Sequence, residues 1–90
     1  MEYVWVFNGA GGRFASAVFS SLKNAEEWIK NHRLSGTLTL YPIDSSAYDW
    51  AISQNFFSPT KPEHSSAEFI SRFTSASQEH HHYEDGAREG

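Results

Sequence analysis

The order of apolar and glycine-rich segments at the start of the chain limits its fold more than any other feature. An aromatic and β-branched run, residues 3–7, is followed by a glycine-rich cluster, residues 8–12, and a second apolar run, residues 14–19. Such runs favour strands, and Asn-Gly with further glycines favours a tight turn between them. The sequence therefore predicts an N-terminal β-hairpin.

An amphipathic helix is predicted directly after the hairpin, within residues 20–32. Leu22, Ala25 and Ile29 recur at helical spacing, and Trp28 widens the apolar stripe. A serine at the start of this stretch can cap the helix by accepting a backbone N–H. One face of the helix is expected to be buried.

The middle of the chain carries a further strand and two further helices. Residues 37–41 alternate between polar and apolar side chains, which indicates a half-buried strand that Pro42 limits. Ser46 and Asp49 have capping-box spacing at the start of residues 47–54, and Ser65 and Glu68 form a second such box. Both boxes predict short helices.

A chain of 90 residues makes one domain with a small core. We expect an α+β fold with three helices and a three-stranded antiparallel or mixed sheet, in the order β-β-α-β-α-α. The first helix should pack on one face of the sheet. The domain is expected to occupy residues 1–79, and the polar residues 80–90 are expected to form a partly disordered tail.

Composition argues against several classes of function. The net charge is −4, and the seven Lys and Arg residues are scattered, which opposes binding to nucleic acid. The absence of cysteine excludes disulfides and thiolate metal sites. No apolar stretch approaches the roughly 20 residues that span a bilayer, and no secretory signal is recognisable. We expect a soluble cytoplasmic protein without a membrane partner.

The histidine-bearing segment near the C-terminus is a candidate metal site. His80 and His82 would face the same way in an extended segment, with Glu84 beyond them. Imidazole and carboxylate groups bind zinc or nickel when a rigid element holds them. A specific site would need a third ligand, and adventitious binding is the competing interpretation.

The remaining polar motifs have simpler structural explanations. The glycine cluster lies between two strand-like runs and lacks the phosphate-binding patterns, so a hairpin turn competes with an anion-binding loop that Arg13 would serve. Asp44 and Asp49 are explained as turn and capping residues rather than as paired catalytic carboxylates. The serines precede helical patterns, where caps belong. These motifs do not predict an enzyme.

Aromatic residues are the other candidate functional group, and most of them should form the core. A sheet face left free of helices would instead suggest a protein contact. The residues that we expect at a ligand or interaction surface are Trp5, Arg13, Phe14 and Tyr41.

Several segments carry a resemblance that covers nearly the whole chain. The first five lie in the predicted hairpin and first helix, and the others extend to the histidine-bearing segment. The segments are W-V-F-N-G at residues 5–9, G-G-R-F at 11–14, F-S-S-L at 19–22, A-E at 25–26, W-I at 28–29, L-S-G-T-L-T at 34–39, Y-P at 41–42, Y-D-W-A at 48–51, F-I at 69–70, R-F-T-S-A-S-Q-E-H at 72–80 and H-Y-E-D-G at 82–86.

Together these segments resemble a family of short bacterial domains of unknown function. The resemblance implies that the histidine-bearing segment is native sequence. It implies no activity, substrate or cofactor.

The leading prediction is therefore a non-enzymatic module, without a cofactor, that binds another protein or itself as a homodimer. The alternative is a protein that binds a metal or a small ligand through its C-terminal histidine and acidic residues. A minimal enzyme ranks below both.

Overall fold

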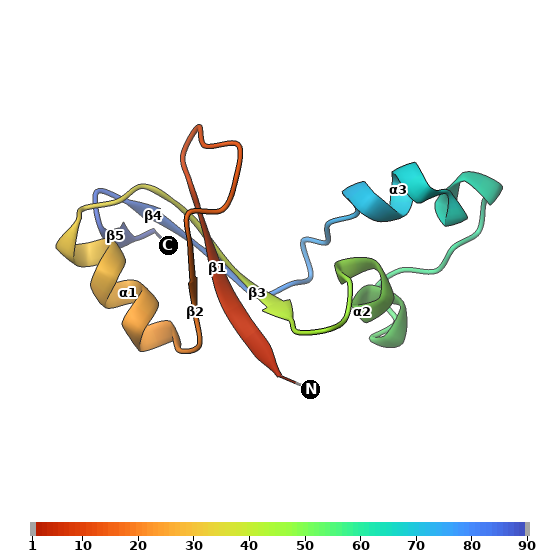
Figure 1. The fold of residues 1–90 in the computed structure, drawn as a ribbon, viewed down its shortest axis with the longest axis horizontal. Coiled ribbons are helices and arrows are strands. Elements are labelled where there is room, and N and C mark those ends of the chain that lie inside the picture. Colours follow the sequence, from red (N-terminus) through yellow and green to blue (C-terminus); the bar gives the residue numbers. More distant parts are fainter. Residues whose placement is uncertain (1, 90) are drawn as a thin grey trace.

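The computed structural model describes residues 2–89, which form a twisted sheet and a helical arm (Figure 1). Its longest dimension is 45 Å, and the other two are 28 and 23 Å. The elements, in chain order, are β1 (Tyr3–Gly9), β2 (Ala17–Phe19), α1 (Leu22–Asn31), β3 (Gly36–Pro42), α2 (Ala47–Ser53), the 3-10 helix η1 (Pro62–Ser65), α3 (Ala67–Arg72), β4 (His80–Glu84) and β5 (Ala87–Arg88).

The sheet is antiparallel and has five strands in the order β2-β1-β3-β4-β5. The α+β class, the antiparallel sheet and the N-terminal hairpin agree with the prediction. The second strand is shorter than predicted, because residues 10–16 form a loop in place of a tight turn. The predicted count of three strands is wrong, because the segment expected to be a polar tail supplies β4 and β5. Residues 80–83 pair with β3, so the sheet continues past the predicted domain boundary at residue 79. Gly90, at the end of the predicted tail, lies outside the described residues.

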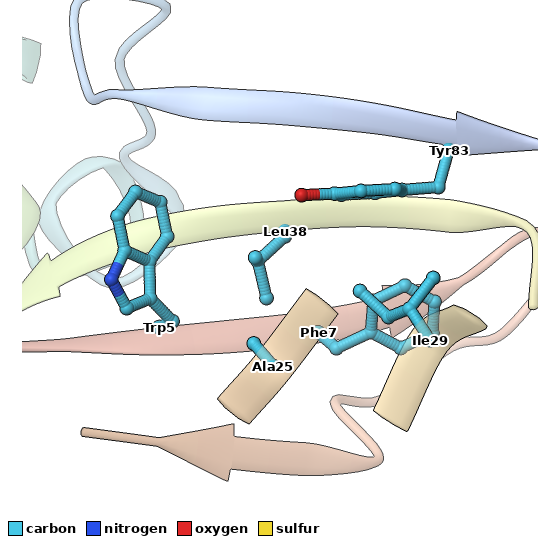
Figure 2. Close-up of a cluster of buried hydrophobic side chains, with 6 residues drawn as sticks. All are labelled: Trp5, Phe7, Ala25, Ile29, Leu38 and Tyr83. Atoms are coloured by element: carbon cyan, nitrogen blue, oxygen red, sulfur yellow. The ribbon is translucent and has the colours of Figure 1, made fainter. Parts of the chain in front are cut away.

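Helix α1 covers one face of the sheet and closes the core. Ser21 caps it by accepting a hydrogen bond from the backbone N–H of Asn24 at 3.1 Å. Ala25 and Ile29, one turn apart, are fully buried against the strands. Figure 2 shows the buried side chains of α1 facing those of β1, β3 and β4; the cluster consists of Trp5, Phe7, Ala25, Ile29, Leu38 and Tyr83.

The turn that joins β4 to β5 depends on Gly86. Asp85 and Gly86 both have positive φ, at 51° and 87°, as a two-residue hairpin turn with the strand-matching twist requires. A Cβ on Gly86 would lie 3.2 Å from the Cα of Lys30, so the turn packs directly on the end of α1. The backbone N–H of Gly86 donates to the carbonyl of Leu34 at 2.9 Å. These contacts hold the last two strands in place.

The helical arm, residues 43–77, contains α2, η1 and α3 and extends away from α1 (Figure 1). Its centre is Tyr48, whose hydroxyl donates to the carbonyl of His64 at 2.8 Å. The side chain of Gln78, which is 2% exposed, closes the base of the arm. Its Nε2 donates to the carbonyl of Leu40, and its Oε1 accepts from the N–H of Ser75. This contact fixes where the chain returns to the sheet.

Candidate functional site

Within residues 2–89, no helix covers the face of the sheet opposite α1, and we call it the open face. Side chains alternate along each strand, so Trp5 and Phe7 point into the core while Val4 and Val6 point the other way. None of the open-face side chains is buried. The open face consists of Val4, Val6, Asn8, Val18, Thr37, Thr39, Tyr41, His80, His82 and Glu84.

Strand pairing arranges these residues in rows across the open face. One row runs from Val18 through Val6 and Thr39 to His80. The valines on β1 and β2 therefore form an apolar half, the threonines of β3 lie in the middle, and β4 supplies a polar half. Val18, on the edge strand β2, is 61% exposed.

The alternation of β4 separates the three consecutive histidines. His81 points to the core side, where its ring stacks on Trp5 with centroids 5.7 Å apart and its Nε2 lies 3.2 Å from a carboxylate oxygen of Glu79. His80 and His82 lie on the open face with ring centroids 5.3 Å apart. The structure thus brings together two of the three predicted metal ligands.

Hydrogen bonds orient both open-face imidazoles. The Nδ1 of His80 lies 2.7 Å from the carbonyl oxygen of Gln78, which can only accept. In the neutral ring this contact places the proton on Nδ1 and leaves the lone pair on Nε2. The Nδ1 of His82 lies 3.3 Å from the hydroxyl oxygen of Thr37, which can donate or accept.

Glu84, the third predicted ligand, shares the face but lies too far along the strand to join His80. Residues four apart on one strand are separated by roughly 13 Å. Among residues 2–89, no group of three histidine, aspartate or glutamate side chains lies close enough to hold a metal. The predicted set of His80, His82 and Glu84 is therefore not preassembled.

A hollow of about 520 Å³ lies at the end of the open face, where the glycine turn meets β3 and β4. His82 and Glu84 line it together with Glu89, whose backbone N–H donates to the carbonyl of His82 at 2.8 Å. Sequence reasoning missed Glu89 because residues 80–90 were assigned to a tail. The Asp85-Gly86 pair was the signal that could have found it, since a two-residue hairpin places Glu89 opposite His82.

The four residues predicted at an interaction surface do not converge. Trp5 is 7% exposed and belongs to the core. Tyr41 is half-buried near the far end of the open face. Arg13 and Phe14 lie together in the loop between β1 and β2, where the guanidinium carbon lies 6.0 Å from the Phe14 ring centre and that ring is 80% exposed.

The other polar features have structural roles. The hydroxyl of Tyr83 donates to Glu26 at 2.6 Å, and the Nε of Arg88 donates to the same carboxylate at 2.9 Å. Burial raises the pKa of Tyr83 to about 12, and the hydrogen bond from Tyr83 lowers the pKa of the Glu26 carboxyl. This hydrogen bond between Tyr83 and Glu26 joins β4 to α1. A tyrosine with a raised pKa is a poor acid catalyst. Asp49 accepts from Ser46, its capping partner.

The aromatic side of the arm has a hollow of its own, of about 570 Å³. Phe69, Phe73 and Arg72 line it, and Arg72 pairs with Glu68 at 2.9 Å. Since Glu68 and Arg72 are both more than 70% exposed, the pair contributes little to stability or to a site.

The chain belongs to the family described as Domain of unknown function (DUF7710), whose sequence model matches residues 4–89. The match includes the hairpin, the arm and the histidine-bearing strand, so all three are parts of the family domain. Comparison with curated proteins and with solved structures gives no match. Over residues 2–89, the helices are too short or too polar to cross a bilayer.

Proposed function

We propose that this protein is a non-enzymatic interaction module that associates with a second copy of itself through the open face of the sheet. The observation that carries the proposal is the contrast between the two faces. The core side chains point toward α1, whereas Val18 is exposed and Val4 and Val6 are only half-buried on the other side. A stripe of accessible aliphatic side chains on a sheet favours contact with another protein surface.

The chemistry of the open face suits a second sheet. Its centre holds β-branched, uncharged side chains, namely Val6, Thr37 and Thr39, which pack well on a pleated surface. Two sheets that pack face to face lie about 10 Å apart with their side chains interdigitated. The edge strands β2 and β5 have three and two residues, so pairing along an edge is the weaker route to association.

Two-fold symmetry makes a copy of the same chain a suitable partner. A two-fold axis that runs across the strands lays each strand of one copy over the same strand of the other. The apolar half then meets the apolar half, and the threonine rows meet each other. Charged groups stay at the rim, because Glu84 lies at the end of β4.

The size of the face sets the strength of the contact. Seven-residue strands and five strands give an area of at most on the order of 500 Å², from roughly 3.3 Å per residue and 4.8 Å between strands. Stable complexes bury about 800 Å² on each partner. We therefore expect a weak, reversible dimer whose population rises with protein concentration.

Sedimentation velocity over a concentration series tests the proposal. The wild-type chain should shift from monomer toward dimer, and Val18→Asp should abolish the shift because it places a carboxylate in the contact. Ile70→Asp is the matched control, since Ile70 is an exposed aliphatic residue on the arm. A wild-type chain that stays monomeric throughout, or an equal loss in the control, would refute the proposal.

A further inference from the structure

We propose that His80 and His82 form a two-histidine chelating site for a divalent transition metal of the imidazole-preferring kind, Cu²⁺, Ni²⁺ or Zn²⁺. The site lies within one chain, on the β4 half of the open face, so its metal affinity is measured at concentrations where the chain is monomeric. The two imidazoles come from alternate positions of β4 and share one face of the sheet. The ring centroids are 5.3 Å apart, and the rings are nearly perpendicular, at 86°.

The strand that carries the two histidines is firmly held. His80 is paired with Thr39 and His82 with Thr37. On the other side of β4, β5 pairs with Tyr83 and Glu84, and the N–H of Glu89 donates to the carbonyl of His82. The neighbouring Tyr83, whose ring is 4% exposed, packs in the core against α1 and so anchors the strand. A ligand pair on a paired strand loses little backbone freedom on binding, which favours a chelate over two independent contacts.

The hydrogen bond of His80 engages one ring nitrogen and leaves the other for a metal. Its Nδ1 donates to the backbone carbonyl of Gln78, which leaves the lone pair of Nε2 directed away from that bond. Histidines that bind metals generally donate their other ring N–H to a carbonyl or carboxylate in this way. The contact between His82 Nδ1 and the Thr37 hydroxyl engages the same nitrogen of the second ring. When Nδ1 of His82 donates to Thr37, its Nε2 is left for the metal, as in His80.

The charge around the pair favours a cation. Glu84 and Glu89 line the hollow beside His82, and the residues that line it include no lysine or arginine. A negative field without a basic side chain opposes binding of a phosphate or carboxylate. Because the described residues supply only two nitrogen ligands, water fills the other coordination positions and the ion exchanges readily.

Titration calorimetry on the chelator-treated full chain tests the proposal, with Cu²⁺, Ni²⁺ and Mg²⁺ as the probes. We expect one ion per chain, tighter binding of Cu²⁺ than of Ni²⁺, and no binding of Mg²⁺, which prefers oxygen ligands. His80→Ala and His82→Ala should each weaken binding by about tenfold or more, because either change destroys the chelate. Replacing both carboxylates, Glu84→Gln and Glu89→Gln, should weaken it only a few-fold.

Two histidines outside the proposed site, His81 and His32, provide matched controls. His81→Ala removes the neighbouring ring on the other face, and His32→Ala removes an exposed ring after α1; both should leave the affinity unchanged. Circular dichroism checks that each variant is folded. Equal losses in the controls, or full affinity in either His80→Ala or His82→Ala, would mean adventitious binding and overturn the proposal.

A spectroscopic measurement on the wild-type chain avoids any effect of substitution on folding. Long-range ¹⁵N NMR spectra of the imidazoles distinguish Nδ1 from Nε2. Adding Zn²⁺ should shift Nε2 of His80 and His82 and leave His81 unmoved. Coordination through Nδ1, or an equal response of His81, would contradict the inferred site.

Discussion

The sheet and the helical arm both contain many aromatic rings but bury them to different degrees. In the sheet, Phe7 is 2% exposed and Leu38 is fully buried, because α1 adds a second layer over residues brought together from distant strands. In the arm, η1 and α3 contain no buried residue. Phe57, Phe69 and Phe73 surround Tyr48 but stay half-exposed, since no further layer covers them. Layering, rather than aromatic content, decides where the stability lies.

Truncating one ring in each region gives the largest expected contrast. Phe7→Ala should lower the free energy of unfolding by about 3–5 kcal/mol, because it leaves a cavity under α1. Phe73→Ala in the arm should lower it by only about 1–2 kcal/mol, because a half-exposed ring gains less from burial. Urea denaturation of both variants checks the difference. Equal losses would show that the arm is packed as firmly as the sheet.

The caps of α1 and α3 provide a smaller contrast. Ser21 accepts from the N–H of Asn24, and Ser66 accepts from the N–H of Phe69, each at 3.1 Å. Ser21→Ala should cost about 1 kcal/mol, because α1 closes the core. Ser66→Ala should cost less, because α3 buries no residue. Thermal unfolding of the two variants measures this; a larger loss for Ser66→Ala would reverse the ranking of the two regions.

We expect the smallest effect on stability from the Glu26 carboxylate, and this effect depends on pH. Because hydrogen bonds from Tyr83 and Arg88 lower the pKa of Glu26, this group stabilises the folded state above its unfolded pKa. That contribution is lost as the pH falls through the folded pKa. It should be below about 1 kcal/mol, because the Glu26 side chain is 36% exposed.

The comparison variant for this effect is Glu26→Gln, which cannot titrate. Between pH 7 and pH 3, wild type should lose slightly more stability than Glu26→Gln in urea denaturation. The same loss in both would exclude Glu26 as a source of acid sensitivity.

The sequence predicted those parts of the fold whose signals are local. The first hairpin followed from an apolar run on each side of the glycines, and α1 followed from its apolar stripe and a serine cap. Ser46 caps α2 as its spacing indicated. These elements reflect contacts within a few residues, which a single sequence displays directly.

Strands β4 and β5 were missed because their stability comes from distant residues. The sequence of β4 is polar, and Tyr83 is its only buried side chain. Its hydrogen-bonding partner β3 begins at Gly36, 44 residues before β4 begins at His80. The common orientation of His80 and His82 was predictable from strand alternation. Their neighbours Thr37 and Glu89 were not, since pairing register sets both.

The most direct test of the account is a dilution series followed by amide NMR of the wild-type chain. If the open face is the surface that associates, resonances of Val6, Val18 and Thr39 should shift with concentration, and those of α1 and the arm should stay fixed. Shifts concentrated on α1 or around Phe69 and Phe73, with an unchanged open face, would contradict the account.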